Sequence, residues 1–175
     1  MSADAPELSY IAHETFLADV EAVGEKLKGD HWRPDFLIGI GRGGLVPAAY
    51  LSHRLGIAML SVDISSGEPG FAEELLEKLG AKVRGGERLL IVDDINDSGT
   101  TIASLRAALE AQGADEAHLR VAVLIDNVSS RAKAEYWSRR IDRRQDKRWF
   151  VFPWEAVAPR ETLIEESQEV PERLG

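Results

Sequence analysis

Apolar residues spaced three or four positions apart recur along the chain and predict helices. In the first such stretch Phe16, Val20 and Val23 fall on one face, the pattern of an amphipathic helix. Pro47 falls in the first turn of the second stretch, where a helix tolerates proline. Four helices are predicted on this basis, over residues 14–28, 45–55, about 71–79 and 100–112.

Short, continuously apolar runs separate these helices and predict strands. The runs do not alternate with polar residues, as they would in a sheet with one face in water, so we expect a parallel sheet covered on both faces. The fold class predicted is α/β, with a mostly parallel twisted sheet and helices on both faces. The predicted strands span residues 36–40, 57–64, 88–93 and 118–126, followed by two short aromatic strands within 134–141 and 148–155.

No repeat or linker divides the chain, so residues 1–158 are expected to form one domain. Residues 159–175 are acidic with a weak apolar pattern, which predicts a loosely held tail.

The composition excludes several classes of protein. No apolar run approaches the roughly 20 residues of a membrane span, and residues 1–10 do not resemble a signal peptide, so a cytoplasmic location is the default expectation. The absence of cysteine excludes a disulfide scaffold and thiol catalysis. A net charge of −9 argues against nucleic acid as a general partner. The basic segment 131–148 is expected to be a solvated face, with a positive rim beside an anionic ligand as the sharper alternative.

The stretch LLIVDDINDSGTT at 89–101 carries the strongest chemical indication. Its turn, residues 96–101, combines Gly99 with hydroxyl side chains at the start of a helix, where backbone N–H groups attract phosphate. A plain helix start capped by Asp97 or Ser98 explains the turn equally well when it is taken alone.

Asp93 and Asp94 precede that turn at the end of a strand, which is where ligands bind in such sheets. Adjacent carboxylates can bind a ribose diol or a hydrated magnesium ion, and the alternative is a structural pair bonded to loop N–H groups. A turn that binds phosphate beside a pair of carboxylates that bind a diol fits a sugar that carries a 5-phosphate. No Walker A loop is present, and GIGRGG at 39–44 does not match the dinucleotide fingerprint GxGxxG.

The stretch LLIVDDINDSGTT closely resembles the motif by which type I phosphoribosyltransferases bind 5-phosphoribosyl-1-pyrophosphate (PRPP). Over about 30–157 the chain is most similar to the xanthine-guanine branch of the purine enzymes. The resemblance implies the type I phosphoribosyltransferase fold with a small C-terminal hood, mainly 127–157, and a mobile catalytic loop at 64–87. It also implies a magnesium-dependent enzyme and a homodimer or higher homo-oligomer.

Individual roles follow from the same resemblance. Asp93 and Asp94 hold the ribose diol and Mg²⁺, and Asp97 is the catalytic residue, close to purine N7 as proton acceptor or transition-state stabiliser. GRGGLVP at 41–47 binds pyrophosphate, with a cis peptide between Arg42 and Gly43. The PRPP-binding residues implied are Arg42, Gly43, Gly44, Asp93, Asp94, Asn96, Asp97, Ser98, Gly99, Thr100 and Thr101.

Further roles concern the loop and the base. Ser65 and Ser66 fall in the mobile loop, and Lys82 and Arg84 are candidate pyrophosphate contacts. In RWFVFPWE the resemblance implies that Trp149 stacks on the base and Phe150 offers a backbone contact. A core aromatic is the alternative for Trp149, and Trp154 is expected to be structural.

One departure leaves the acceptor open. Asp126 or Asn127 stands where the branch carries a lysine for the exocyclic oxygen of a 6-oxopurine, although Lys133 lies near enough in sequence to compensate. A carboxylate accepts hydrogen bonds, so Asp126 as a base-binding residue suits an amine or ring N–H better than a carbonyl. The expected function is phosphoribosyl transfer from PRPP to a purine or purine-like base with release of pyrophosphate, 6-oxopurine salvage being the first candidate. The alternatives are a PRPP- or nucleotide-binding regulator, or a transferase for a non-purine acceptor.

Overall fold

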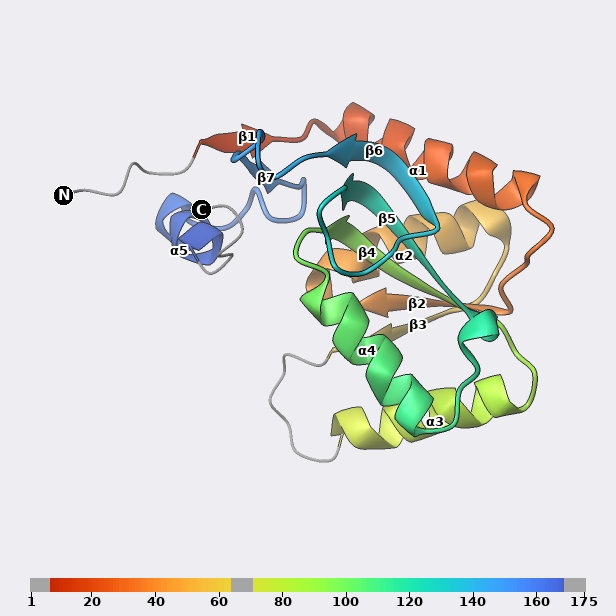
Figure 1. Cartoon of the computed structure of the whole chain (residues 1–175). Coiled ribbons are helices and arrows are strands. Elements are labelled where there is room, and N and C mark those ends of the chain that lie inside the picture. Colours follow the sequence, from red (N-terminus) through yellow and green to blue (C-terminus); the bar gives the residue numbers. More distant parts are fainter. Residues whose placement is uncertain (1–6, 64–70, 169–175) are drawn as a thin grey trace.

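A computed structural model describes residues 7–63 and 71–168. Its main sheet has five strands, all parallel, in the order β3-β2-β4-β5-β6 (Figure 1). The strands are β2 (Phe36–Ile40), β3 (Met59–Val62), β4 (Leu89–Asn96), β5 (Leu119–Asn127) and β6 (Tyr136–Ile141). The parallel α/β sheet expected from the continuous apolar runs is therefore confirmed.

Helices cover both faces of this sheet (Figure 1). Leu37 and Leu90 face the apolar layer under α1 and α2, whereas Ile38 and Ile91 face the layer under α3 and α4. Successive residues of a strand point to opposite faces, so both faces need apolar side chains, and this explains the continuous runs. The helices are α1 (His13–Gly29), α2 (Gly41–Leu55), α3 (Phe71–Arg84) and α4 (Thr100–Ala111), with a 3-10 turn at Glu116–His118.

A smaller layer lies beside the carboxyl end of the main sheet (Figure 1). The short strand β1 (Leu8–Tyr10), which the sequence did not indicate, pairs in parallel with β7 (Trp149–Val151). Residues expected to be a loosely held tail instead contain helix α5 (Arg160–Gln168), whose Leu163 is buried. The aromatic stretch at 136–141, expected in the hood, is an edge strand of the main sheet.

Helix α2 begins four residues earlier than its apolar spacing predicted, directly after β2. Pro47 therefore lies inside the helix rather than in its first turn. The expected cis peptide at Arg42–Gly43 is wrong: no described residue has a cis peptide bond, and α-helical hydrogen bonding through this segment requires trans peptides.

Glycine at the start of α2 lets the helix lie directly on the backbone of β4. A Cβ atom built at Gly44 would fall 2.1 Å from the carbonyl oxygen of Val92. The glycines of GRGG, in the first turn of α2, thus bring the end of β2 and the end of β4 together. Two predicted ligand-binding segments therefore lie at one edge of the sheet.

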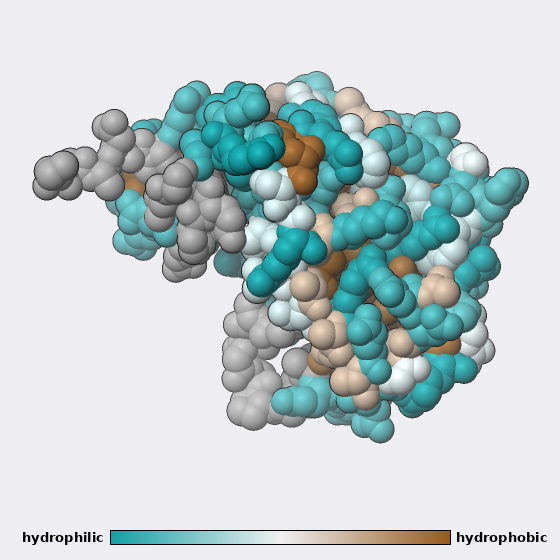
Figure 2. Space-filling model, in the orientation of Figure 1, coloured by the Kyte–Doolittle hydropathy of each residue, from teal (hydrophilic) through white to brown (hydrophobic). Residues whose placement is uncertain are grey.

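The outer surface in the view of Figure 2 is mainly hydrophilic, with apolar side chains showing only in small areas. Among the described helices, none has the length and apolar composition needed to cross a bilayer.

Candidate active site

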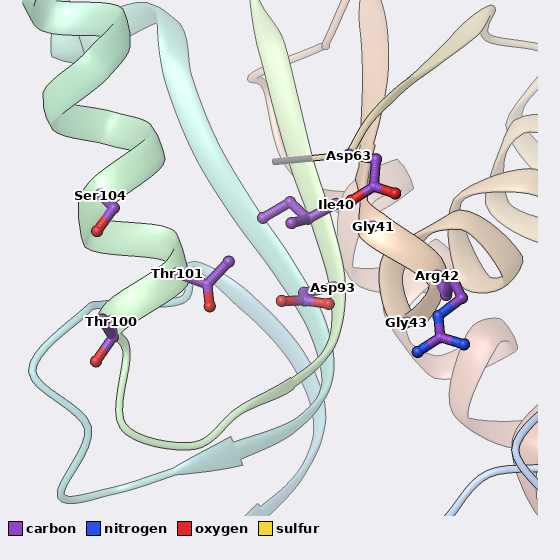
Figure 3. A pocket seen from close by; sticks show the side chains of 9 residues that line it. All are labelled: Ile40, Gly41, Arg42, Gly43, Asp63, Asp93, Thr100, Thr101 and Ser104. Atoms are coloured by element: carbon purple, nitrogen blue, oxygen red, sulfur yellow. The ribbon is translucent and has the colours of Figure 1, made fainter. Parts of the chain in front are cut away.

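A cavity of about 420 Å³ opens at the carboxyl edge of the main sheet, between the start of α2 and the first turns of α4. Figure 3 shows Asp93 and Thr101 on opposite sides of this space, each directed toward it. The two turns singled out in the sequence therefore line one cavity. Its lining residues are Ile40, Gly41, Arg42, Gly43, Asp63, Asp93, Thr100, Thr101 and Ser104.

A second cavity, of about 160 Å³, is formed by the turn between β4 and α4 together with Asp93. The N-cap of α4 is Gly99, with a φ of 80°, and no side chain caps the helix. Neither Asp97 nor Ser98 is therefore the N-cap residue that the alternative interpretation required, although the Ser98 hydroxyl accepts from the Thr100 N–H at 3.2 Å. A helix start without a capping side chain suits the binding of an anion such as phosphate.

One carboxylate oxygen of Asp93 and one of Asp94 accept a backbone N–H at the end of β4. The Asp94 N–H donates to Asp93 Oδ1 at 3.0 Å, and the Ile95 N–H donates to Asp94 Oδ1 at 2.7 Å. The structural interpretation of the pair is supported, because backbone N–H groups at the end of β4 hold one oxygen of each carboxylate, and binding of a diol or Mg²⁺ stays a prediction. Gly43 is packed against this pair, since a Cβ there would lie 2.7 Å from Asp94 Oδ2.

The edge formed by these carboxylates disfavours negative charge. Burial raises the pKa of Asp93 to about 7, and burial together with the neighbouring Asp93 charge raises the pKa of Asp94 well above its ordinary value. Glu155, to which the sequence drew no attention, adds to the effect: burial and the charge of Asp94 raise its pKa to about 7. No described cation forms an ion pair with Asp93 or Asp94, so a bound cation would relieve this repulsion.

Asp97 is held by an arginine that the sequence did not single out. Arg143 Nε and Nη2 donate to the two carboxylate oxygens of Asp97 at 2.8 and 2.7 Å. Arg143 is 2% exposed, and Asn127 Nδ2 donates to the backbone oxygen of Asp97 at 2.9 Å. The loop at Asp97 is therefore fixed both by its side chain and by its backbone.

Asp126 is buried, and its carboxylate has internal partners. Asn96 Nδ2 donates to Asp126 Oδ1 at 2.9 Å, and Arg140 Nε donates to Asp126 Oδ2 at 3.0 Å. Asn96 also accepts from the hydroxyl of Ser130 at 2.8 Å. In this arrangement Asp126 and Asn96 tie β4, β5 and β6 together; Asn96 also lines the smaller cavity, whereas Asp126 lines neither of the two cavities described above.

The candidate pyrophosphate contacts separate into two groups. Arg42 lines the larger cavity, with its side chain almost fully exposed and Glu166 of α5 at 3.9 Å. Lys82 instead lies over the ring of Phe36 at the amino end of β2, and Arg84 donates to the carbonyl of Gln112 after α4. Both residues are at the opposite edge of the sheet, so they cannot contact a ligand in the cavity. Ser65 and Ser66 lie outside the described residues.

Two of the predicted base-binding residues, Trp149 and Phe150, lie in strand β7. Trp149 is partly exposed and Phe150 is buried, with Arg143 over the ring of Phe150 at 5.2 Å. Trp154 stacks on Phe152 at 4.9 Å and meets Phe16 edge to face at 5.3 Å, so its expected structural role is confirmed.

The basic segment is largely neutralised by neighbouring carboxylates rather than forming a positive rim. Its ion pairs include Lys133–Glu135, Arg139–Asp19, Arg140–Asp126, Arg143–Asp97, Arg144–Asp142 and Arg148–Asp146. Arg131 differs, because its guanidinium donates to the hydroxyl of Thr100, a residue of both cavities. Asp63, which follows β3, is a further cavity residue to which the sequence gave no role; its place at a strand end was the available signal.

A family model described as a phosphoribosyl transferase domain matches residues 8–158. The chain belongs to this family. The match spans both cavities and β7. The predicted family and the predicted enzyme class, a PRPP-dependent phosphoribosyltransferase, are thereby confirmed.

Several solved structures have the same fold. A purine phosphoribosyltransferase from Pyrococcus horikoshii is 26% identical, with 86% of this chain and 96% of that chain covered at a TM-score of 0.64. A xanthine-guanine-hypoxanthine phosphoribosyltransferase from Helicobacter pylori is 21% identical (85% and 94% covered, TM-score 0.63). A hypothetical protein from Neisseria gonorrhoeae with bound ppGpp is also 21% identical, with 99% and 100% covered and a TM-score of 0.68. The two structures at 21% identity bear on the fold alone.

Proposed function

We propose that this phosphoribosyltransferase transfers the phosphoribosyl group of PRPP to a ring nitrogen of a purine or purine-like base. The observation that carries the proposal is the pair of adjoining cavities that share Asp93, Thr100 and Thr101. The smaller one, at the start of α4, suits the 5-phosphate, and the larger one, between Asp93 and the GRGG turn, suits the ribose and its pyrophosphate.

In this proposal the residues around the two cavities have separate roles. Backbone N–H groups and hydroxyls of residues 98–101 hold the 5-phosphate, while Asp93 and Asp94 accept hydrogen bonds from the ribose diol. Arg42, at the mouth of the larger cavity, offers its guanidinium to the pyrophosphate oxygens as the bond to the ribose breaks. Asp97 accepts from the base N–H, which becomes more acidic as the ring nitrogen forms its bond to the ribose.

Magnesium fits this set of residues. The elevated pKa of Asp93 and of Asp94 marks two buried carboxylates that a divalent cation would stabilise in their ionised form. The described residues contain no cluster of three or more metal-binding side chains, which suits an ion held by one or two carboxylates together with substrate phosphates. When bound, the ion neutralises charge on the departing pyrophosphate.

The acceptor is proposed to be a purine because of the 26% identical purine phosphoribosyltransferase and because Trp149 of β7 presents a partly exposed aromatic ring. A 6-oxopurine is the first candidate. A non-purine acceptor is the second, and it is favoured by Asp126, which is buried and bonded to Asn96 and Arg140 at the position where the purine branch carries a lysine.

A base-panel assay tests the proposal. Purified protein is incubated with PRPP, Mg²⁺ and one base at a time (hypoxanthine, guanine, xanthine, adenine, uracil or orotate), and pyrophosphate release is measured. We expect release with at least one purine and the corresponding nucleotide as product. Turnover with a pyrimidine alone would select the second candidate, and no release with any base would refute transferase function.

A further inference from the structure

Arg143 makes contacts with two parts of the site that are far apart in sequence. Toward the phosphate loop, the turn of residues 96–101, it binds both carboxylate oxygens of Asp97 through Nε and Nη2. Toward the hood its Nη1 donates to the carbonyl oxygens of Asp146 at 3.2 Å and Arg148 at 2.7 Å. One guanidinium therefore links the loop that carries Asp97 to the residue that precedes Trp149.

The surroundings of Arg143 fix it in place. Its backbone N–H donates to Asn127 Oδ1 at 3.2 Å, and Asn127 Nδ2 in turn donates to the backbone oxygen of Asp97. Its guanidinium lies 5.2 Å from the ring centroid of Phe150, within the range of a cation–π contact. The Arg143 side chain is 3% exposed and that of Asp97 13%, so Asp97 is the more accessible member of the pair.

The ion pair leaves Asp97 able to bind a base. An ionised carboxylate has about four acceptor positions, and a bidentate arginine occupies two of them. The remaining positions can accept an N–H of the base. In the described part of the chain, no side chain other than Arg143 donates to this carboxylate, so its orientation depends on Arg143.

We propose that Arg143 is a positioning residue for phosphoribosyl transfer, an inference that rests on the proposed function. It orients the Asp97 carboxylate, and it fixes the distance between Asp97 and strand β7, which carries Trp149. Acting through Asp97 and the Arg148 carbonyl, it contributes to turnover and to base binding. Its effect on PRPP binding is expected to be small, because none of its contact residues lines the larger cavity and, of the contact residues named above, only Asp97 lines the smaller one.

The test is a kinetic comparison of Arg143→Met and Arg143→Lys with Arg144→Met as the matched control. Arg144 is the adjacent arginine, it is mostly exposed, and it pairs with Asp142. We expect Arg143→Met to lower kcat about 10–100-fold and to raise KM for the base, with KM for PRPP within about threefold of wild type. Arg143→Lys restores part of kcat, because lysine keeps the charge but not the bidentate geometry. Arg144→Met behaves as wild type.

A double-mutant cycle with Asp97→Asn separates positioning from a general structural effect. If Arg143 acts through Asp97, Arg143→Met lowers kcat by less than about threefold in the Asp97→Asn background. A full additional loss there, or wild-type kcat in folded Arg143→Met, overturns the inference while leaving transferase function intact. If Arg143→Met does not fold, Arg143→Lys decides: a wild-type kcat and base KM overturns the inference. Wild-type protein without activity on any base would instead overturn the proposed function and this inference with it.

Discussion

At the scale of single residues, the chemistry of the site is set by where charge is compensated. Asp97 has Arg143 as its partner, whereas no described cation pairs with Asp93 or Asp94. A charge left uncompensated in a protein interior is costly, and a site can use that cost when a cationic or hydrogen-bonding ligand arrives. The carboxylates of LLIVDDIN and the following turn therefore have different roles despite their proximity in sequence.

Asp97→Asn should separate turnover from PRPP binding. The amide cannot accept a proton, so we expect kcat to fall about 10²–10⁴-fold. KM for PRPP should change little, because the phosphate loop and the Asp93–Asp94 pair are intact. Steady-state kinetics with both substrates varied measures this. An unchanged kcat would remove the assigned role of Asp97.

Asp93→Asn should stabilise the ligand-free protein. The pKa of Asp93 is about 7 in the folded state and about 3.9 in an unfolded chain, so the folded state binds more protons between these values. Ionisation of Asp93 therefore destabilises the folded protein increasingly as pH rises from about 4 to about 7. Asparagine does not ionise, so the variant avoids this destabilisation.

We expect a gain of about 1–2 kcal/mol at pH 8 and a negligible gain near pH 4, measured by urea unfolding without Mg²⁺. Activity should fall, because the diol and magnesium lose a ligand. Glu73→Gln, at an exposed position of α3, serves as the control and should leave stability unchanged. A gain that does not depend on pH would contradict the explanation.

Arg131→Ala should weaken PRPP binding. Its guanidinium donates to the Thr100 hydroxyl beside the phosphate loop, and its backbone N–H donates to the carbonyl of Ser98 at 3.2 Å. Loss of an exposed cation next to a phosphate should raise KM for PRPP about 3–10-fold with kcat nearly unchanged. Arg144→Ala is the control, and an equal effect of both variants would point to general electrostatics.

At the scale of elements, the site is assembled from the starts of two helices and the ends of three strands. Helix α2 lies against β4 because Gly44 has no side chain, and α4 begins at Gly99 without a capping side chain. A Cβ at Gly99 would also fall 2.5 Å from both the Ala132 N–H nitrogen and the Ser130 hydroxyl oxygen. Both glycines thus serve the packing of the site as well as access for a phosphate.

Gly44→Ala should be destabilising by about 1–3 kcal/mol, because the added methyl group would overlap the Val92 carbonyl. Urea unfolding measures this. The matched control is Gly29→Ala at the last turn of α1, where no atom lies within 4 Å of the added Cβ and no loss is expected. Similar losses in both variants would refute the proposed close contact between α2 and β4.

At the scale of the whole molecule, the ligand-free protein carries acidic groups with pKa values shifted in both directions. Asp93, Asp94 and Glu155 have raised pKa values at the site, whereas a backbone N–H of Trp32 and the Tyr136 hydroxyl lower the pKa of Asp30 to about 2. The first three groups stabilise the fold as pH falls through 7. Asp30 loses its stabilising effect as pH falls below about 4.

We therefore expect the ligand-free protein to be most stable between about pH 4 and pH 6. Thermal unfolding from pH 4 to pH 8 measures the maximum. Mg²⁺ with PRPP should move the maximum to higher pH, because these ligands bind the ionised carboxylates. A maximum at pH 8 without ligands would contradict the assignment of buried, uncompensated carboxylates to the site.

The homo-oligomer implied by the resemblance stays a prediction. The large apolar residues exposed in the described chain include Tyr10, Leu45, Tyr50 and Val157. Sedimentation equilibrium checks the oligomeric state directly, with a single monomeric species as the contradicting result.

The sequence by itself determined the features that depend on neighbours along the chain. The parallel sheet could be predicted because each strand needs apolar residues on both faces. The phosphate loop could be recognised because strand, turn and helix start are contiguous, so Asp93, Gly99 and Thr101 must lie close together. The early start of α2 was missed because glycines are poor helix formers, and only packing on β4 selects them there.

Tertiary structure alone decided which distant groups meet. Arg143 and Asp97 are 46 residues apart, and nothing in the apolar pattern distinguishes Arg143 from the exposed Arg144 beside it. Asp126 was expected to face the base, yet packing gives it Asn96 and Arg140 as partners. A charged side chain takes its partner from whatever the folded chain brings within reach, and that information resides in the packing of elements rather than in their local periodicity.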